Sequence, residues 1–237
     1  MTIHQKFLSR FFRSVVLTFL VLGSVGGGVS YAEMEHDGQL WFPLYNRFHL
    51  PEDFLGWVEV NPRFGDNVSE IDQLLLRPAL GYKLSESFSI WQGYAWVTNY
   101  EPGYRDEHRL YQQLSYRHAF PHLKISSRTR LEERFIRNAR GTALRAREMV
   151  RGDFPIDSNK QWGVVVYDEV FINLNTLLGG PESGFDQNRF FVGMNHRFND
   201  SLSVDFGYQN QAINRRRGPD AMNHIILIQW FIDWGKS

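Results

Sequence analysis

Apolar and polar residues alternate with a period of two along most of the chain after Gln39. The segment 187–198 is typical: Phe190, Val192 and Met194 alternate with residues such as Arg189 and Asn195. This period indicates β-strands, whose successive side chains point to opposite faces of a sheet. The pattern predicts strands, with no helix between them, at 39–49, 55–64, 71–84, 88–100, 107–120, 123–135, 142–154, 161–174, 187–198, 202–213 and 222–232.

The length of these segments favours a membrane barrel over a soluble one. Strands of soluble proteins average about 5–6 residues, whereas tilted membrane strands need about 9–11, and most of the segments here are at least that long. Aromatic residues near the segment ends suit the interfacial girdles of such a barrel. These are Trp57, Phe64, Tyr82, Trp96, Tyr100, Tyr116, Phe154, Trp162, Trp230 and Trp234. We expect one all-β, antiparallel, up-and-down transmembrane barrel of about 10–12 strands. A soluble β-sandwich or lipocalin-like barrel, which also alternates, is the alternative fold.

The connections alternate between short and long. Tight turns on the periplasmic side and longer loops outside the cell are typical of outer-membrane barrels. We therefore expect the outer loops at 100–106, 137–141, 177–186 and 214–220. Arg215, Arg216 and Arg217 in the last of these are interpreted as a solvated loop tip, with contact to lipopolysaccharide phosphates as the alternative.

The first 32 residues have the pattern of a secretory signal peptide. A basic region with Lys6, Arg10 and Arg13 precedes the apolar run 14–23, and Ser30-Tyr31-Ala32 resembles a cleavage site. The apolar run is shorter than the ~20 residues that a spanning helix needs. We expect cleavage near Ala32, a barrel domain over 33–237, and insertion into the bacterial outer membrane by the barrel-assembly machinery. Outer-membrane lipid and lipopolysaccharide would then surround it.

Composition adds a feature that alternation alone does not reveal. The mean hydropathy is −0.38 although 15% of the residues are aromatic, which suits strands with one apolar and one polar face. The chain has no cysteine, its net charge is zero, and nothing in it indicates a nucleic-acid partner. After residue 32 it has 19 Arg but only 4 Lys. Arginine suits confined ion pairs, because its planar guanidinium binds carboxylates through two hydrogen bonds.

The polar face of a barrel lines its lumen, so the candidate site is the set of inward charges. In phase with the alternation these are Glu59, Arg63, Arg77, Arg109, Gln113, Arg117, Arg128, Arg130, Glu132, Arg134, Arg145, Arg147, Glu169, Arg189 and Arg197. One hypothesis is a structural ion-pair network that fills a narrow lumen. The other is a narrow pore that prefers small anionic solutes. Three carboxylates, Glu133, Glu148 and Asp168, fall on the apolar face unless bulges shift the register.

An enzyme is the weaker hypothesis. A lipid-modifying barrel, of phospholipase or acyltransferase type, would need a nucleophile and a base on its outer face. His118, His196 and His224 fall on or near outward positions, but none forms a recognisable motif with a serine. We therefore assign no catalytic residue, metal site or cofactor. A surface or adhesive protein that acts through its outer loops is a third possibility.

The order of several short motifs resembles a known family. The run Leu76 to Leu84 (LRPALGYKL) is followed by Gly93-Tyr94, by Glu107 to Gln113, and by Arg128 to Arg134. Arg145 and Arg147, then 168–173, 187–189 and 208–211, complete the series. In that order the chain resembles the DUF2490 family of presumed outer-membrane β-barrels. The resemblance implies a barrel and an outer-membrane location, and it implies no catalytic residues.

Overall fold

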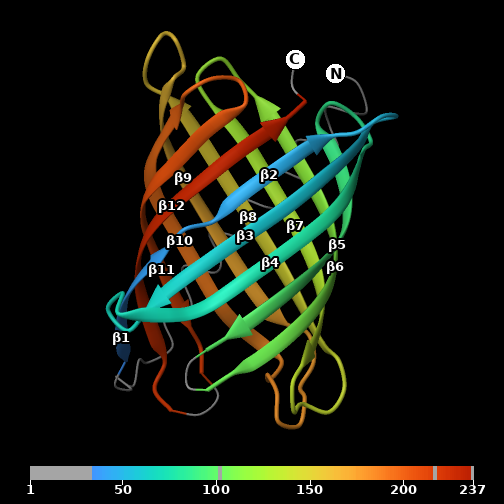
Figure 1. Cartoon of the computed structure of the whole chain (residues 1–237), viewed down its shortest axis with the longest axis vertical. Helices are drawn as coiled ribbons and strands as arrows, with labels where there is room; N and C mark the ends of the chain where they lie inside the picture. The colour runs from blue at the N-terminus through green and yellow to red at the C-terminus, as the bar shows by residue number, and fades with distance from the viewer. Residues whose placement is uncertain (1–33, 101–102, 216–217, 236–237) are drawn as a thin grey trace, which may run out of the picture. The chain divides into compact units, whose positions relative to one another are not determined.

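The described residues of the chain form twelve β-strands in a single sheet (Figure 1). A computed structural model describes residues 34–100, 103–215 and 218–235, so the predicted signal peptide 1–32, Arg216 and Arg217 lie outside the described residues. No helix in the described ranges is long and apolar enough to cross a membrane. The strands are β1 (Glu35–Trp41), β2 (Leu44–His49), β3 (Phe54–Gly65), β4 (Glu70–Lys83), β5 (Phe88–Asn99), β6 (Arg105–Ala119), β7 (Lys124–Ile136), β8 (Ala143–Pro155), β9 (Trp162–Asn173), β10 (Gly184–Arg197), β11 (Leu202–Ile213) and β12 (Ala221–Trp234).

Strands β1 and β2 occupy one position in the barrel. Both pair with β12 on one side and with β3 on the other, and the register continues from Trp41↔Leu227 to Leu44↔Trp230. Pro43, which has no N–H to donate to a ladder, lies at the break between them. The sheet therefore closes as a barrel of eleven strands, within the predicted range of ten to twelve.

The barrel is mixed, and the expectation of a purely antiparallel barrel is wrong. Every sequential pair from β2–β3 to β11–β12 is antiparallel, but β1 and β2 pair with β12 in parallel. The reason is geometric: with an odd number of alternating strands, the first and the last must run in the same direction. The chain therefore enters the barrel at one end and leaves it at the other.

The two ends of the barrel differ in their connections. At one end, here called the short-turn end, lie the connections 50–53, 84–87, 120–123, 156–161 and 198–201, together with the end of β12. At the other, the long-loop end, lie 66–69, 100–104, 137–142, 174–183 and 214–220, together with the start of β1. Both register irregularities of the ladders, at Arg63/Phe64 and at Phe185/Gln187, are near the long-loop end.

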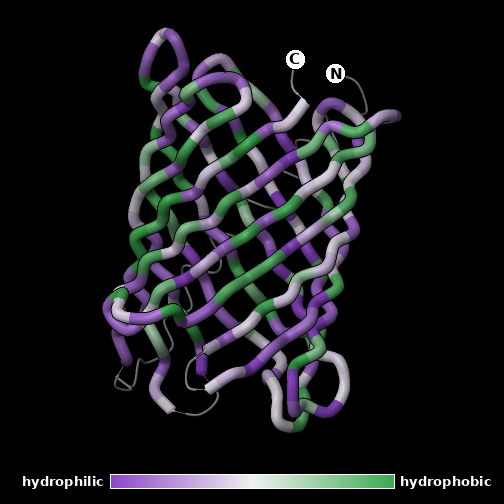
Figure 2. Tube along the Cα trace, viewed as in Figure 1, coloured by the Kyte–Doolittle hydropathy of each residue, from purple (hydrophilic) through white to green (hydrophobic). Residues whose placement is uncertain are grey.

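The barrel has an apolar outside and a largely polar inside. Neighbours in sequence alternate in exposure: Leu131 is 40% exposed, whereas Arg130 and Glu132 on either side are 4% and 1% exposed. Figure 2 shows this alternation as green and purple segments along the strands. The periodicity thus reflects a sheet whose charged face points into a confined space and whose apolar face points out.

No bulge turns the three carboxylates on the apolar face inward. The ladders run without interruption through Glu133, Glu148 and Asp168. Two of these carboxylates accept hydrogen bonds there: Thr129 Oγ1 donates to Glu148 at 2.5 Å, and Asn188 Nδ2 donates to Asp168 at 2.9 Å. For Glu148 and Asp168, a local polar partner thus offsets part of the cost of desolvating the carboxylate.

Candidate functional site in the barrel interior

The interior divides into two parts along the barrel axis. Towards the long-loop end, charged side chains pack against one another in what we call the closed layer, which is centred on Glu107, Glu132 and Glu169. Towards the short-turn end lies an open cavity of about 680 Å³. Strands β6 to β10 supply charged residues to both parts, which share Arg147, Arg189 and Glu169.

Glu132 is the most buried charge of the closed layer. Its Oε2 accepts hydrogen bonds from Arg145 Nε and NH2, at 2.9 and 2.6 Å, and its Oε1 accepts one from Arg147 NH1 at 2.6 Å. Arg145 is its direct cross-strand neighbour, so the ladder between β7 and β8 places the pair. Arg145 also donates to Asp186 at 2.8 Å, which extends the layer to β10.

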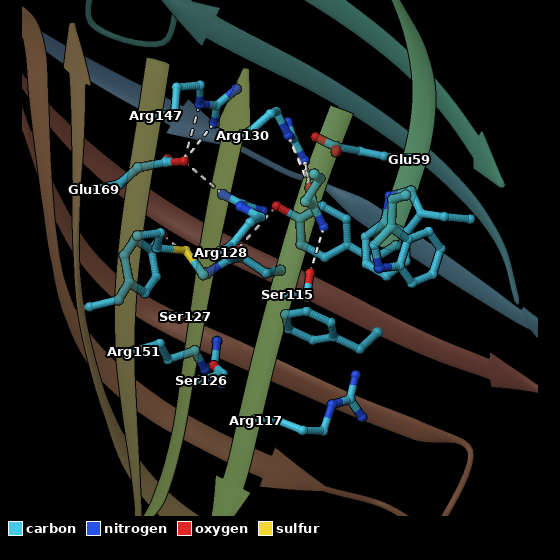
Figure 3. Close-up of a pocket in the computed structure, with 18 of the residues that line it drawn as sticks. Glu59, Ser115, Arg117, Ser126, Ser127, Arg128, Arg130, Arg147, Arg151 and Glu169 are labelled. Atoms are coloured by element: carbon cyan, nitrogen blue, oxygen red, sulfur yellow. Dashed lines mark hydrogen bonds and ion pairs between the residues drawn. The ribbon is translucent and has the colours of Figure 1, made fainter. Parts of the chain in front are cut away.

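Two further carboxylates each hold more than one arginine. Glu107 accepts hydrogen bonds from Arg109 Nε and Arg134 Nε, both at 2.6 Å. Glu169 accepts hydrogen bonds on one oxygen from Arg147 NH2 at 2.7 Å and from Arg128 NH2 at 2.8 Å (Figure 3). Such charge-assisted hydrogen bonds are the strongest type in proteins, and each carboxylate here bridges two strands or more. The network therefore ties β6, β7, β8 and β9 together from the inside.

Aromatic rings lie under the guanidinium groups. The ring of Phe171 is 4.4 Å from the Arg147 guanidinium carbon and 4.7 Å from that of Arg189. The Arg63 guanidinium carbon lies 3.6 Å from the Trp41 ring centre. Rings stabilise cations through their quadrupole, by about 2 kcal/mol or more where both are desolvated. The carboxylates of the lumen are fewer than the arginines, so the aromatic rings supply part of the stabilisation of the guanidinium groups.

The cavity has two unlike walls. Its cationic wall comes from β6, β7 and β8 and contains Arg117, Arg128, Arg130, Arg147 and Arg151. Its apolar wall comes from β12, β1, β2 and β3, which adjoin one another on the opposite side of the ring. That wall contains Leu227, Phe231, Trp41, Tyr45 and Trp57.

The sequence-predicted residues fall into three places. Those in the closed layer alone are Arg109, Glu132, Arg134 and Arg145. Those that line the cavity are Glu59, Arg63, Arg77, Gln113, Arg117, Arg128, Arg130, Arg147, Glu169 and Arg189. Arg197 lies apart from both: its side chain is 40% exposed and pairs with Asp200 at 3.7 Å near the short-turn end.

Two groups of interior residues were not predicted from the sequence. Glu107 and Asp186 complete the closed layer. Glu107 continues the alternation of β6 towards the long-loop end, whereas Asp186 is out of phase with Arg189 and lies at the bulge between Phe185 and Gln187, so alternation alone does not place it inside. The apolar wall was missed because we treated the inward face as uniformly polar. Trp57, expected in an outer girdle, instead lines the cavity, in phase with Glu59. A signal for inward apolar residues existed: the runs 163–167 and 225–228 are apolar at every position, and thus on both faces.

The outward histidines make local contacts. His224 bonds to the hydroxyl of Tyr208 at 2.7 Å through Nδ1 and to His36 at 3.0 Å through Nε2. The rings of His118 and His196 lie against aromatic neighbours. In the described part of the chain, none of these three sequence-predicted histidines is hydrogen-bonded to a serine, and no cluster of three or more His, Asp or Glu side chains could hold a metal ion.

The fold and the interior together define a class: a closed β-barrel with an apolar exterior and an arginine-rich lumen. A family model described as "Protein of unknown function (DUF2490)" matches residues 38–223. An uncharacterized protein of Methylorubrum extorquens is 34% identical over 226 residues, which cover 92% of this chain and 96% of that protein. The chain therefore belongs to the DUF2490 family, and the resemblance inferred from the order of its motifs is confirmed.

Proposed function

We propose that the protein is a bacterial outer-membrane β-barrel whose lumen is closed by its own side chains. The observation that carries this proposal is the inversion of its faces. Large apolar side chains such as Leu80 and Ile226, 52% and 60% exposed, cover the outside, while arginines and carboxylates are buried inside. Soluble monomers rarely expose apolar surface on this scale. A lipid bilayer is the surrounding that such an exterior fits.

The closed layer favours a structural barrel over an open pore. A water-filled channel leaves its lining side chains accessible, but Glu132, Arg145 and Glu169 are between 1% and 4% exposed. Each also has its hydrogen-bonding groups engaged across strands. We therefore expect no steady ion current through the resting protein.

The connections support one orientation in the membrane. Short turns face the periplasm in outer-membrane barrels, and longer loops face outwards. The short-turn end, and with it the mouth of the cavity, would then face the periplasm.

Location and orientation can be tested together, because the chain has no native cysteine. We would introduce Glu182→Cys in the longest long-loop connection and, as the matched variant, Asp200→Cys in a short turn. A membrane-impermeant maleimide should label the first variant on intact cells and the second only after the outer membrane is permeabilised. If only the second variant is labelled on intact cells, the barrel has the opposite orientation in the membrane. Recovery of the folded protein in a soluble fraction without detergent, or the lack of a gel-mobility difference between unboiled and boiled samples, would refute the membrane barrel.

The closed lumen is tested in planar bilayers. We expect no stable conductance steps from the purified protein. The excess of arginine in the lumen favours a narrow anion pore as the second candidate. The result that favours the anion pore over the closed barrel is a set of anion-selective conductance steps. Arg130→Glu should then abolish these steps, and Arg137→Glu, on an exposed loop, should leave them unchanged.

A further inference from the structure

We propose that the cavity at the short-turn end is a binding site for a small amphipathic anion. Such a molecule would carry a phosphate, sulfonate or carboxylate group on an aromatic or aliphatic body. The volume of about 680 Å³ lies within the usual range of small-molecule sites, about 300–1,000 Å³. Neither a structural barrel nor an ion channel requires such a site.

The cationic wall has more positive charge than its carboxylates neutralise. Among the described residues, nine arginines line the cavity, but only four carboxylates do: Glu59, Glu86, Asp153 and Glu169. Asp153 pairs with Arg151 at 2.5 Å, and the single carboxylate of Glu169 is shared by Arg147 and Arg128. Arg117, nearer the mouth (Figure 3), makes no ion pair with any described residue. An anion entering from the short-turn end therefore meets the Arg117 guanidinium before the paired arginines, such as Arg151, which already holds Asp153 and Asp205.

Several guanidinium N–H groups in this wall also lack an acceptor. Arg130 donates through Nε and NH2 to Gln113, while its NH1 has no hydrogen-bond partner among the described residues and lies 3.8 Å from Glu132. The Nε group of Arg128 in the same wall is likewise without an acceptor in the described chain, as is that of Arg63 on β3, across the cavity. Arg130 and Arg63 are 4% and 8% exposed, and buried donors are costly to leave unsatisfied. These three N–H groups are themselves buried, so they add positive charge behind the cavity surface. A phosphate-like group has several acceptor oxygens in a compact volume, which the more accessible guanidinium groups of Arg117 and Arg128 would bind.

The opposite wall accounts for the apolar part of the ligand. Trp57 and Phe231 face the cavity from β3 and β12, and Trp41 of β1 also lines it, with the Arg63 guanidinium over its ring. Tyr45 packs against Trp57 and Phe231, with ring centres 5.3 and 4.9 Å apart, and these contacts fix the rings in place. A hydrophilic anion would leave this wall hydrated and gain nothing from it. A planar or aliphatic body would cover it and release that water.

The test uses three matched probes on the full-length protein in an uncharged detergent. These are 1-naphthyl phosphate, 1-naphthol and inorganic phosphate, and binding is measured by titration calorimetry against a micelle blank. We expect 1-naphthyl phosphate to bind at least about tenfold more tightly than either other probe, since each lacks one of the two parts. Equal binding by 1-naphthol would overturn the role of the cationic wall, and equal binding by inorganic phosphate would overturn that of the apolar wall.

Variants then locate the site. Arg117→Gln and Arg128→Gln should each weaken binding of 1-naphthyl phosphate by about tenfold, and Trp57→Leu by about threefold. Arg137→Gln is the control, because Arg137 is an exposed arginine outside the cavity, at the long-loop end. It should leave the affinity unchanged, and Arg117→Gln removes no ion pair, so it should fold normally. An equal loss in Arg137→Gln, or no loss in either cavity variant, would overturn the proposal.

Discussion

The two halves of the lumen contain the same kinds of residue but use them in opposite ways. In the closed layer, Glu132 receives three hydrogen bonds from two arginines and is 1% exposed. In the cavity, the arginines outnumber their acceptors, and Arg117 has none among the described residues. The first arrangement fills space and joins strands, whereas the second leaves positive charge and room. The two halves thus differ in the ratio of carboxylates to arginines and not in the presence of arginine. A high ratio suits an interior that holds strands together, and a low ratio suits one that binds an anion.

The largest expected effect comes from neutralising the centre of the closed layer. Glu132→Gln keeps the shape of the side chain but leaves Arg145 and Arg147 without their shared counter-charge. Removing one partner of a buried ion pair typically costs about 3–5 kcal/mol in the free energy of unfolding. Urea unfolding in detergent, followed by the gel-mobility shift, measures this. Wild-type stability in this variant would show that the layer does not hold the barrel together.

An intermediate effect is expected where an inward glycine makes room for a ring. A Cβ added at Gly93 would lie 2.1 Å from Cζ of Tyr111, whose ring faces the Arg130 guanidinium at 4.2 Å. Gly93→Ala should therefore force the ring aside and cost about 1–3 kcal/mol, as overpacking of interiors does. The double variant Gly93→Ala with Tyr111→Leu should recover part of this loss. If the single variant is as stable as the wild type, the Tyr111 ring can move towards the cavity at no cost in stability. The cavity lining around Tyr111 would then be deformable.

These expectations depend on a division of the lumen that alternation alone did not reveal. The period of two placed Arg128, Arg130 and Glu132 on one face, and that face is the inner one. Alternation is a local property, so one strand at a time suffices for it. The segment 39–49 was also found as a single segment, although Pro43 interrupts its ladder.

The parallel closure and the two halves of the lumen depend on residues far apart in sequence. Arg151 bonds to Asp205, and Tyr45 to Gln229, across strands whose proximity follows from the closed ring. No local pattern in the sequence indicates which strands pair with each other. The odd number of predicted strands did imply a parallel pair where the barrel closes, because strand directions cannot alternate all the way around a ring with an odd number of strands.

The smallest expected effect on stability is the most direct test of the comparison. Arg128 donates one hydrogen bond to Glu169, and its side chain is 25% exposed towards the cavity. In Arg128→Gln, Glu169 keeps the two hydrogen bonds from Arg147, so no buried carboxylate loses its counter-charge. The free energy of unfolding should change by about 1 kcal/mol or less, as for a partly exposed pair. Added salt should narrow the difference further, because ions can screen a pair that borders open space.

In Glu132→Gln the loss should persist in salt, because no ion reaches the closed layer. Unfolding of both variants in low and high salt measures the two halves on one scale. A loss in Arg128→Gln as large as that in Glu132→Gln, and equally insensitive to salt, would mean that the cavity is as sealed as the layer beneath it. The comparison would then fail, and the arginines of the cavity would also be structural.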